Sequence, residues 1–169
     1  MKTKFALGTA VLFLAVLSIL SCKKETKTAP IQFLLVDKPA TYDSVNVHIV
    51  GMQVQINHDT AAWIPVNTKD SIYNLLDLQN GITTVIAQDT VPVGVLQQVR
   101  FILGDNNTVV VNGTSYPLET PSADNSGLKV KIGRVLAETL NTFTLDFDAA
   151  LSVNEENGVY KLHPVIQLR

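Results

Sequence analysis

The fold is decided by the stretch SVNVHIVGMQVQI, residues 44–56. Apolar side chains alternate with polar ones along it, but they occupy odd positions before Gly51 and even positions after it. A period of two is typical of a strand with one buried face. One glycine is too short a turn to join two strands. We therefore predict a single long strand with a bulge at Gly51, where one extra residue re-aims the side chains that follow.

The rest of the chain from Ile31 onward consists of short β-rich runs between turn signals. Asn-Gly pairs, in which both residues tolerate the positive φ of a type I′ turn, occur three times. They are residues 80–81, 112–113 and 157–158. A strand is expected over residues 95–103, with Val95 and Leu103 on its apolar face, and a short helical turn over residues 82–88. Pro164 cannot donate to a sheet, so the last strand is expected to lie at an edge or to break there.

The N-terminus has the three parts of a secretory signal peptide. Two early lysines precede an apolar run that ends at Ile19-Leu20-Ser21-Cys22, which resembles a bacterial lipobox. The run is shorter than the about 18–20 residues that a membrane-spanning helix needs. We expect residues 1–21 to be removed and Cys22 to become the lipidated first residue. Residues 22–30 are polar and are expected to form a flexible tether.

This anchor predicts the location of the protein. Acyl chains on Cys22 would hold it in a lipid bilayer effectively permanently. We expect a cell-envelope lipoprotein, in the outer membrane of a Gram-negative, Bacteroidetes-like bacterium, on either the surface or the periplasmic side. With the signal peptide removed, Lys plus Arg falls from 13 to 11 against 15 acidic residues, a net charge of −4. Such a charge argues against a nucleic-acid partner.

Short strands, frequent turn signals and the absence of an amphipathic helix predict the fold class. We expect an all-β protein with a single β-sandwich domain, immunoglobulin- or transthyretin-like, over residues 31–169. A mature chain of this length can bury a sufficient core as one domain. The only cysteine is the one expected to be lipidated, so the core has to stabilise this domain without a disulfide.

Several blocks of the chain follow an order that resembles a known family. They are FLLVDKPA (33–40), YNLLDLQNG (73–81), QQVRFIL (97–103), YPL (116–118), SGLK (126–129), LDFD (145–148) and HPVI (163–166). Together they resemble the domain-of-unknown-function family 4382 of bacterial and archaeal envelope proteins. That family has no established activity, so the resemblance implies a location and a fold rather than a chemistry.

No catalytic constellation is found, so we expect a protein that is not an enzyme and has no cofactor. The histidines lack the spacing of a zinc site; they are His48, His58 and His163. Asp146 and Asp148 share one face of a strand, where two carboxylates could hold calcium or act as an acid–base pair. The favoured interpretation is a solvated strand face, with Lys129 or Lys131 as a partner across the sheet.

Aromatic side chains could stack on sugar rings. Trp63 and Tyr42 are the candidates, and packing in the core is the alternative for such residues. The leading functional prediction is a non-catalytic envelope module that binds an envelope protein or has a structural role. A carbohydrate-recognition module of a glycan-uptake system is the second prediction, and a hydrolase or metal-binding protein using Asp146 and Asp148 is the third.

One short pattern recurs more often than composition predicts. The triplet of Asp, then Ser or Thr, then an aliphatic residue or Thr resembles the O-glycosylation sequon of exported Bacteroidetes proteins. The resemblance implies glycans on Ser44, Thr60, Ser71 and Thr90. The alternative is that Asp-Ser and Asp-Thr are favourable turn pairs ahead of β-branched strands.

Overall fold

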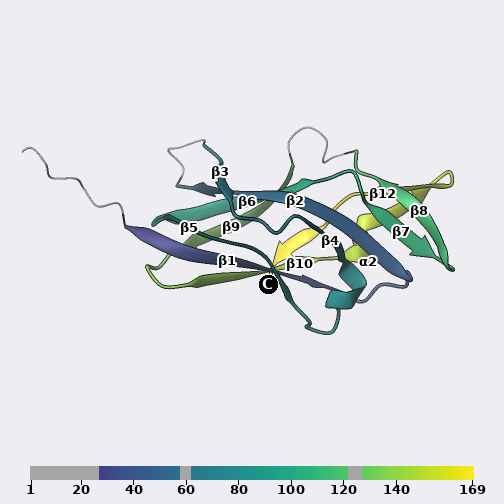
Figure 1. Ribbon diagram of the computed structural model, residues 1–169, viewed down its shortest axis with the longest axis horizontal. Helices are drawn as coiled ribbons and strands as arrows, with labels where there is room; N and C mark the ends of the chain where they lie inside the picture. Colours follow the sequence, from purple (N-terminus) through teal and green to yellow (C-terminus); the bar gives the residue numbers. More distant parts are fainter. Residues whose placement is uncertain (1–26, 58–61, 122–126) are drawn as a thin grey trace, which may run out of the picture.

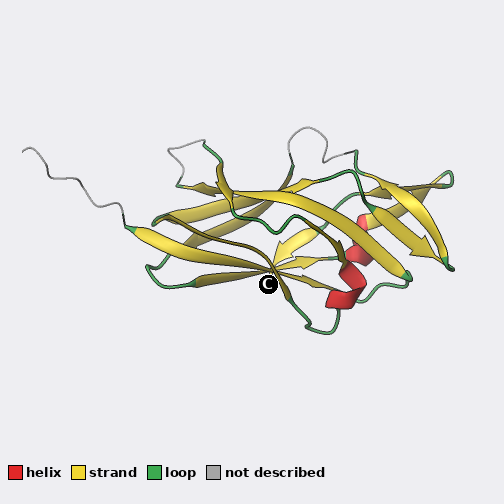
Figure 2. Ribbon diagram, viewed as in Figure 1, coloured by secondary structure: helices red, strands yellow, loops and turns green. Residues whose placement is uncertain are grey.

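The computed structural model describes residues 27–57, 62–121 and 127–169. In these ranges the chain forms two mixed β-sheets packed face to face, with two short helical turns beside them (Figures 1 and 2). The prediction of an all-β sandwich is therefore confirmed. No helix within the described ranges is long and apolar enough to cross a membrane. The predicted signal peptide and Cys22 lie outside them.

The smaller sheet has the strand order β13-β10-β1-β5. Its strands are β1 (Thr28–Asp37), β5 (Thr84–Pro92), β10 (Asn141–Phe147) and β13 (Ile166–Leu168). The central strand β1 runs parallel to β10 and antiparallel to β5. It begins at Thr28 rather than at Ile31, because residues 28–30 already pair with the last residues of β5. The expected tether is shorter by these residues.

The larger sheet is built around β2, the long strand that the sequence predicts. Its strands are β2 (Ser44–Ile56), β3 (Ile64–Val66), β4 (Ser71–Asn74), β6 (Val95–Leu103), β7 (Thr108–Val111), β8 (Thr114–Glu119), β9 (Leu128–Val135), β11 (Val153–Glu156) and β12 (Val159–Leu162). Asn46 pairs with Thr108 of β7 and with Asn74 of β4, so these two strands lie on opposite edges of β2. By the same reasoning β6 shares its edge with β7, and β3 shares the other edge with β4.

The predicted bulge in β2 is confirmed. Ile49 pairs with Leu103 of β6 and Gly51 pairs with the adjacent Ile102, so Val50 is the extra residue. The inward-facing residues consequently have odd numbers before the bulge and even numbers after it, and all of these apolar residues are buried. They are Val45, Val47 and Ile49 before it, and Met52, Val54 and Ile56 after it.

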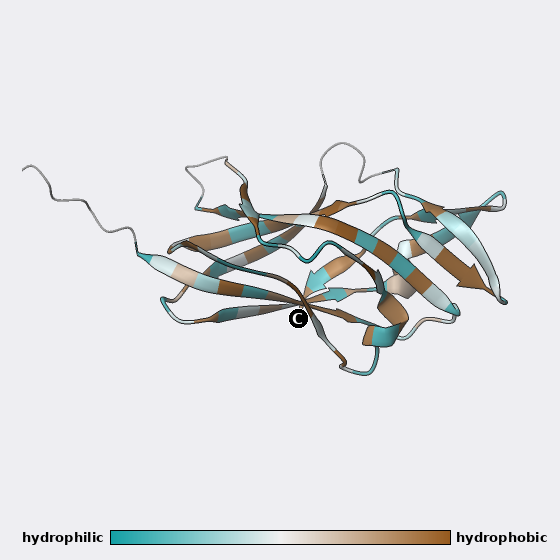
Figure 3. Cartoon of the chain, viewed as in Figure 1, coloured by the Kyte–Doolittle hydropathy of each residue, from teal (hydrophilic) through white to brown (hydrophobic). Residues whose placement is uncertain are grey.

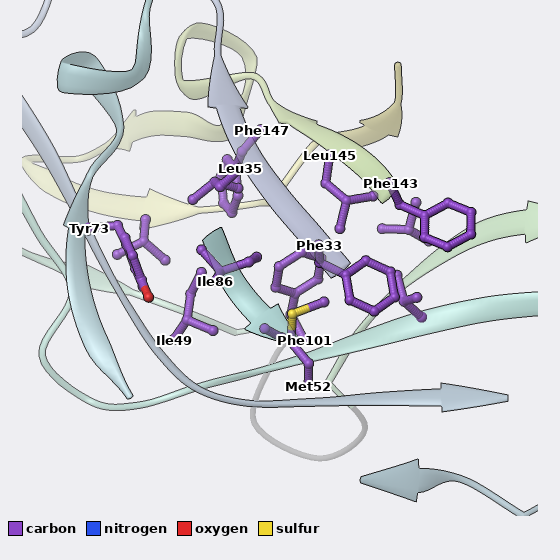
Figure 4. Packing of buried hydrophobic residues seen from close by; sticks show 14 of the residues in the cluster. Phe33, Leu35, Ile49, Met52, Tyr73, Ile86, Phe101, Phe143, Leu145 and Phe147 are labelled. Atoms are coloured by element: carbon purple, nitrogen blue, oxygen red, sulfur yellow. The ribbon is translucent and has the colours of Figure 1, made fainter. Parts of the chain in front are cut away.

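The core fills the space between the two sheets (Figure 4). Figure 3 shows hydrophobic and hydrophilic residues alternating along the strands that supply it. From β1 and β10, Phe33 and Phe143 stack with their ring centroids 5.5 Å apart. Phe101 and Met52 face them from the larger sheet, and both are almost completely buried. Each such side chain contributes about 1.5–3 kcal/mol by leaving water, so this layer holds the sheets together without a disulfide.

Two local predictions are wrong. The helical turn expected over residues 82–88 is not formed. Residues 84–88 instead belong to β5, where β-branched side chains favour the extended backbone that pairs with β1. The helical turns lie elsewhere, at η1 (Leu75–Leu78) and α2 (Ala149–Ser152). The second error concerns Val95, which was expected on the apolar face of β6. A bulge at Gln97 shifts the inward-facing positions by one residue, so Leu96 is buried and Val95 is not.

The turn predictions hold. Residues 112–113 and 157–158 form two-residue hairpins, β7–β8 and β11–β12, and both residues of each pair have positive φ. Residues 80–81 also have positive φ and lead from η1 toward β5. Pro164 separates β12 from β13, and β13 is an edge strand as expected.

Candidate functional site

The outer face of β2, β6 and β9 carries rows of long polar side chains. Their neighbours in sequence point into the core, so these residues must project outward. The strand register aligns them into the rungs Gln53-Arg100-Lys129 and Gln55-Gln98-Lys131. We call these six residues together with Trp63 the Trp63 face. Its charged side chains are all cationic.

Trp63 lies on this outer face rather than in the core. It directly precedes β3, whose pairing with residues 52–54 brings it to the edge of β2. The indole is half-buried, and the Arg100 guanidinium carbon is 4.5 Å from its ring centroid. Lys129 Nζ approaches the same ring at 6.0 Å. Two cations near one indole favour a fixed ring orientation through cation–π attraction.

Hydrogen bonds between neighbouring side chains order both rungs. Arg100 Nη2 donates to Gln53 Oε1, and Gln98 Nε2 donates to Gln55 Oε1. A glutamine amide that accepts through its oxygen still has an NH₂ group with which to donate. The face can therefore offer several aligned hydrogen-bond donors beside an aromatic ring.

An open groove adjoins the second rung. It has a volume of about 410 Å³ and is lined by Gln55, Gln97, Gln98, Lys131, Ile132 and Gly133. This volume lies in the range of small-ligand sites, about 300–1,000 Å³. Because the groove is open, it suits a ligand that lies along the sheet with one side in solvent.

The two residues predicted to stack on sugars are not brought together. Tyr42 lies between β1 and β2, beside the start of β2, whereas Trp63 lies beside the second half of β2. The Tyr42 hydroxyl donates to the Val153 carbonyl at 3.2 Å. Tyr42 is therefore tied to β11, and Trp63 alone belongs to the polar outer face.

Asp146 and Asp148 do not form a solvated strand face, and this prediction is wrong. Both are about 94% buried. Asp148 Oδ2 is 3.1 Å from Lys38 Nζ, and Asp146 Oδ2 is 3.8 Å from Arg169 Nε. These cations replace the expected lysines of β9. Lys38 follows β1, which runs parallel to β10, and Arg169 follows β13, which pairs antiparallel with β10.

Asp37 is a third buried carboxylate, and it was not among the predicted site residues. Its Oδ1 accepts a 2.8 Å hydrogen bond from the Ala149 backbone N–H at the start of α2. Burial raises the pKa of Asp37 to about 6, against the lowering effect of this bond and others, and the nearby charge of Asp148 adds to the increase. The signal for it was present, since the alternation of β1 points residue 37 inward.

The carboxylates act mainly on the local backbone. The Asp148 side chain accepts from the Leu151 N–H at 3.1 Å, so Asp148 and Asp37 both cap α2. Within residues 27–57, 62–121 and 127–169, no group of three or more His, Cys, Asp or Glu side chains is placed to hold a metal ion. His48 Nε2 contacts Asp70 Oδ1 at 2.9 Å, His163 is exposed, and His58 lies outside these ranges.

The predicted glycosylation sites have different surroundings. Thr90 is exposed on β5, whereas Ser44 and Ser71 are half-buried at the first positions of β2 and β4. The Ser44 hydroxyl accepts a hydrogen bond from Asn46 at 3.2 Å. Thr60 and Cys22 lie outside the described residues. Thr90 is therefore the site most open to a modifying enzyme among the three whose surroundings are known.

The fold and these sites define the class of protein. It is an all-β sandwich with a polar, aromatic-edged outer face and a separate group of buried carboxylates. The chain belongs to the family described as Domain of unknown function (DUF4382), whose model matches residues 28–164, from the first residue of β1 to the proline before β13. Comparisons with curated proteins and with solved structures gave no match.

Proposed function

We propose that this protein is a non-catalytic module of the cell envelope, anchored by lipid on Cys22, that binds carbohydrate on its Trp63 face. The proposal rests on one observation above all. The Trp63 indole is held beside Arg100, next to two aligned rungs of amide and cationic side chains on an open sheet surface.

This combination of groups suits a sugar. The apolar face of a pyranose ring can stack on an indole, while its hydroxyl groups hydrogen-bond to side-chain amides such as those of Gln53 and Gln98. Arg100 and Lys129 would add charge-assisted bonds to a carboxylate or sulfate substituent. An acidic polysaccharide is therefore the preferred ligand class, and a glycan-uptake system is one setting in which such a module would work.

The buried carboxylates support a non-catalytic role. Asp37 and Asp148 bond to backbone N–H groups of α2, and Asp148 also pairs with Lys38. Asp146 is buried beside Arg169. Carboxylates engaged in this way stabilise the junction of β1, β10 and α2, and they are poorly placed to reach a substrate. Their structural role accounts for these buried carboxylates, so no catalytic role is needed to explain them.

The anchor and the location rest on the sequence. A basic start, an apolar run and the lipobox-like residues 19–22 together favour lipidation, which would place the module at the outer membrane of a Gram-negative envelope. A lipid-held binding module needs a folded domain directly after a short tether. The family match beginning at residue 28 fits that organisation.

The binding proposal is tested with Trp63→Ala in the full-length lipoprotein, using titration against neutral and uronic-acid-containing polysaccharides. Loss of a stacking contact worth about 1.4 kcal/mol weakens binding about tenfold. Tyr42→Phe is the matched control, because it keeps the ring and changes an aromatic residue outside the Trp63 face. Equal affinities of wild type and Trp63→Ala for every polysaccharide bound would contradict the proposal.

A further inference from the structure

The N-terminal end of β1 lies at one end of the long axis of the sandwich (Figure 1). The Lys27 carbonyl accepts from the Val93 N–H at 3.0 Å, and Lys27 Nζ pairs with Glu138. The Leu136 N–H donates to the Gly94 carbonyl at 2.8 Å. The start of β1, the β5–β6 turn and the β9–β10 connection therefore meet at the same end. We call this group of segments the tether end.

Two large apolar side chains at the tether end are exposed. Val135, the last residue of β9, is 78% exposed, and Leu140, just before β10, is 54% exposed. They flank the connection that contains Glu138, the partner of Lys27. A single exposed leucine needs no explanation. Two exposed apolar side chains, beside the point where the chain leads to its expected anchor, do call for an explanation.

The tether limits how far this end can lie from a membrane. Lys27 is five positions after Cys22, and five extended residues span at most about 18 Å. The charge of the region also suits a bilayer. Arg134 is exposed next to Val135, and in this part of the chain Lys23, Lys24 and Lys27 outnumber Glu25 and Glu138. Lysine and arginine near a membrane surface favour anionic lipids.

We propose that the tether end docks on the lipid bilayer, with Val135 and Leu140 entering the interfacial region. This inference rests on the lipid anchor of the proposed function, and it adds an orientation that an anchor alone does not impose. The long axis of the sandwich then points away from the membrane, and the β7–β8 and β11–β12 hairpins form the distal end (Figure 1). The Trp63 face lies along the side, where a polysaccharide can reach it.

The test uses the full lipoprotein in vesicles of phosphatidylethanolamine and phosphatidylglycerol. Lipidation occupies the only natural cysteine, so Val135→Cys and Leu140→Cys each accept one thiol-reactive, environment-sensitive fluorophore. Val159→Cys and Leu151→Cys are the matched controls, because they change the same residue types at exposed positions away from the tether end. The readouts are the emission wavelength and quenching by lipids with brominated acyl chains.

The expected result is a blue shift and quenching at positions 135 and 140, and neither effect at 151 and 159. A protein that floats with the vesicles but gives the same emission at all four positions overturns the docking proposal and leaves the anchor intact. A protein that does not float with vesicles overturns the anchor itself, and the docking proposal with it. Since both test positions are exposed, either variant alone can decide the outcome.

Discussion

Asp37 shows how one residue can link strand alternation to pH. The inward-pointing residues of β1 are apolar up to Leu35, and the next inward position holds a carboxylate that is 98% buried. The Ala149 N–H compensates for part of its lost hydration. The part of the lost hydration that is not compensated disfavours the charged carboxylate, which is why the pKa of Asp37 rises to about 6.

This pKa predicts an unusual pH dependence of stability. The folded protein binds the Asp37 proton more tightly than the unfolded chain, whose aspartate pKa is about 3.9. The contribution of Asp37 to stability is therefore complete below about pH 4 and is lost as the pH rises through about 6, a change of up to about 3 kcal/mol. Asp37→Asn should remove this dependence while keeping an oxygen for the Ala149 N–H.

Urea unfolding of wild type and Asp37→Asn across this pH range measures the effect. As the pH rises, the unfolding free energy of the wild type should fall relative to that of Asp37→Asn. Asp105→Asn, which makes the same change at an exposed aspartate, is the control for the substitution itself. A wild type and an Asp37→Asn variant that change in parallel with pH would show that Asp37 does not titrate differently in the folded state.

At the scale of elements, β2 connects the core to the Trp63 face. One side of the strand supplies Val54 to the core, and the other supplies Gln53 and Gln55 to the outer rungs. The bulge at Val50 keeps this division correct along the whole strand, because it accommodates one extra residue, and odd positions before it and even positions after it then face the same side. The register is therefore a requirement for both stability and binding.

The bulge gives a prediction with opposite outcomes for two single-residue deletions in β2. Deleting Val50 removes the extra residue, so Met52, Val54 and Ile56 keep facing inward and the variant should fold. Deleting Gln53 instead turns Val54 and Ile56 to the outer face and should abolish folding, as measured by circular dichroism. Gly51→Ala should be tolerated within about 1 kcal/mol, since its new Cβ would meet Ile102 at an ordinary 3.5 Å. An unfolded Val50 deletion, or a folded Gln53 deletion, would refute the role of Val50 as the extra residue.

The elements also show what the sequence can and cannot predict. The alternation in β2 and the Asn-Gly turns depend on neighbouring residues, and both were predicted correctly. The strand β5 was mistaken for a helical turn because its residues owe their conformation to pairing with β1. The contact of Trp63 with Arg100 was not predictable, since it depends on β3 docking beside β2. The partners of Asp148 and Asp146 depend on the pairing of β10 with β1 and with β13, respectively.

At the scale of the whole molecule, three regions have separate roles in this account. In the proposed orientation the tether end faces the bilayer and the Trp63 face lies along the side of the sandwich, while the carboxylates stabilise the junction around α2. The separation predicts that Trp63→Ala changes ligand binding without changing vesicle association. Flotation of this variant with phospholipid vesicles, compared with wild type, checks the prediction. Loss of flotation would mean that the two surfaces are not independent.

The lipid on Cys22 is the claim on which the location and the docking both rest, and the intact mass of the protein purified from its native membrane tests it most directly. The account predicts the mass of residues 22–169 plus acyl chains, with further hexose-sized steps if sites such as Thr90 carry glycans. A mass equal to the unmodified polypeptide, with or without residues 1–21, would contradict the anchor.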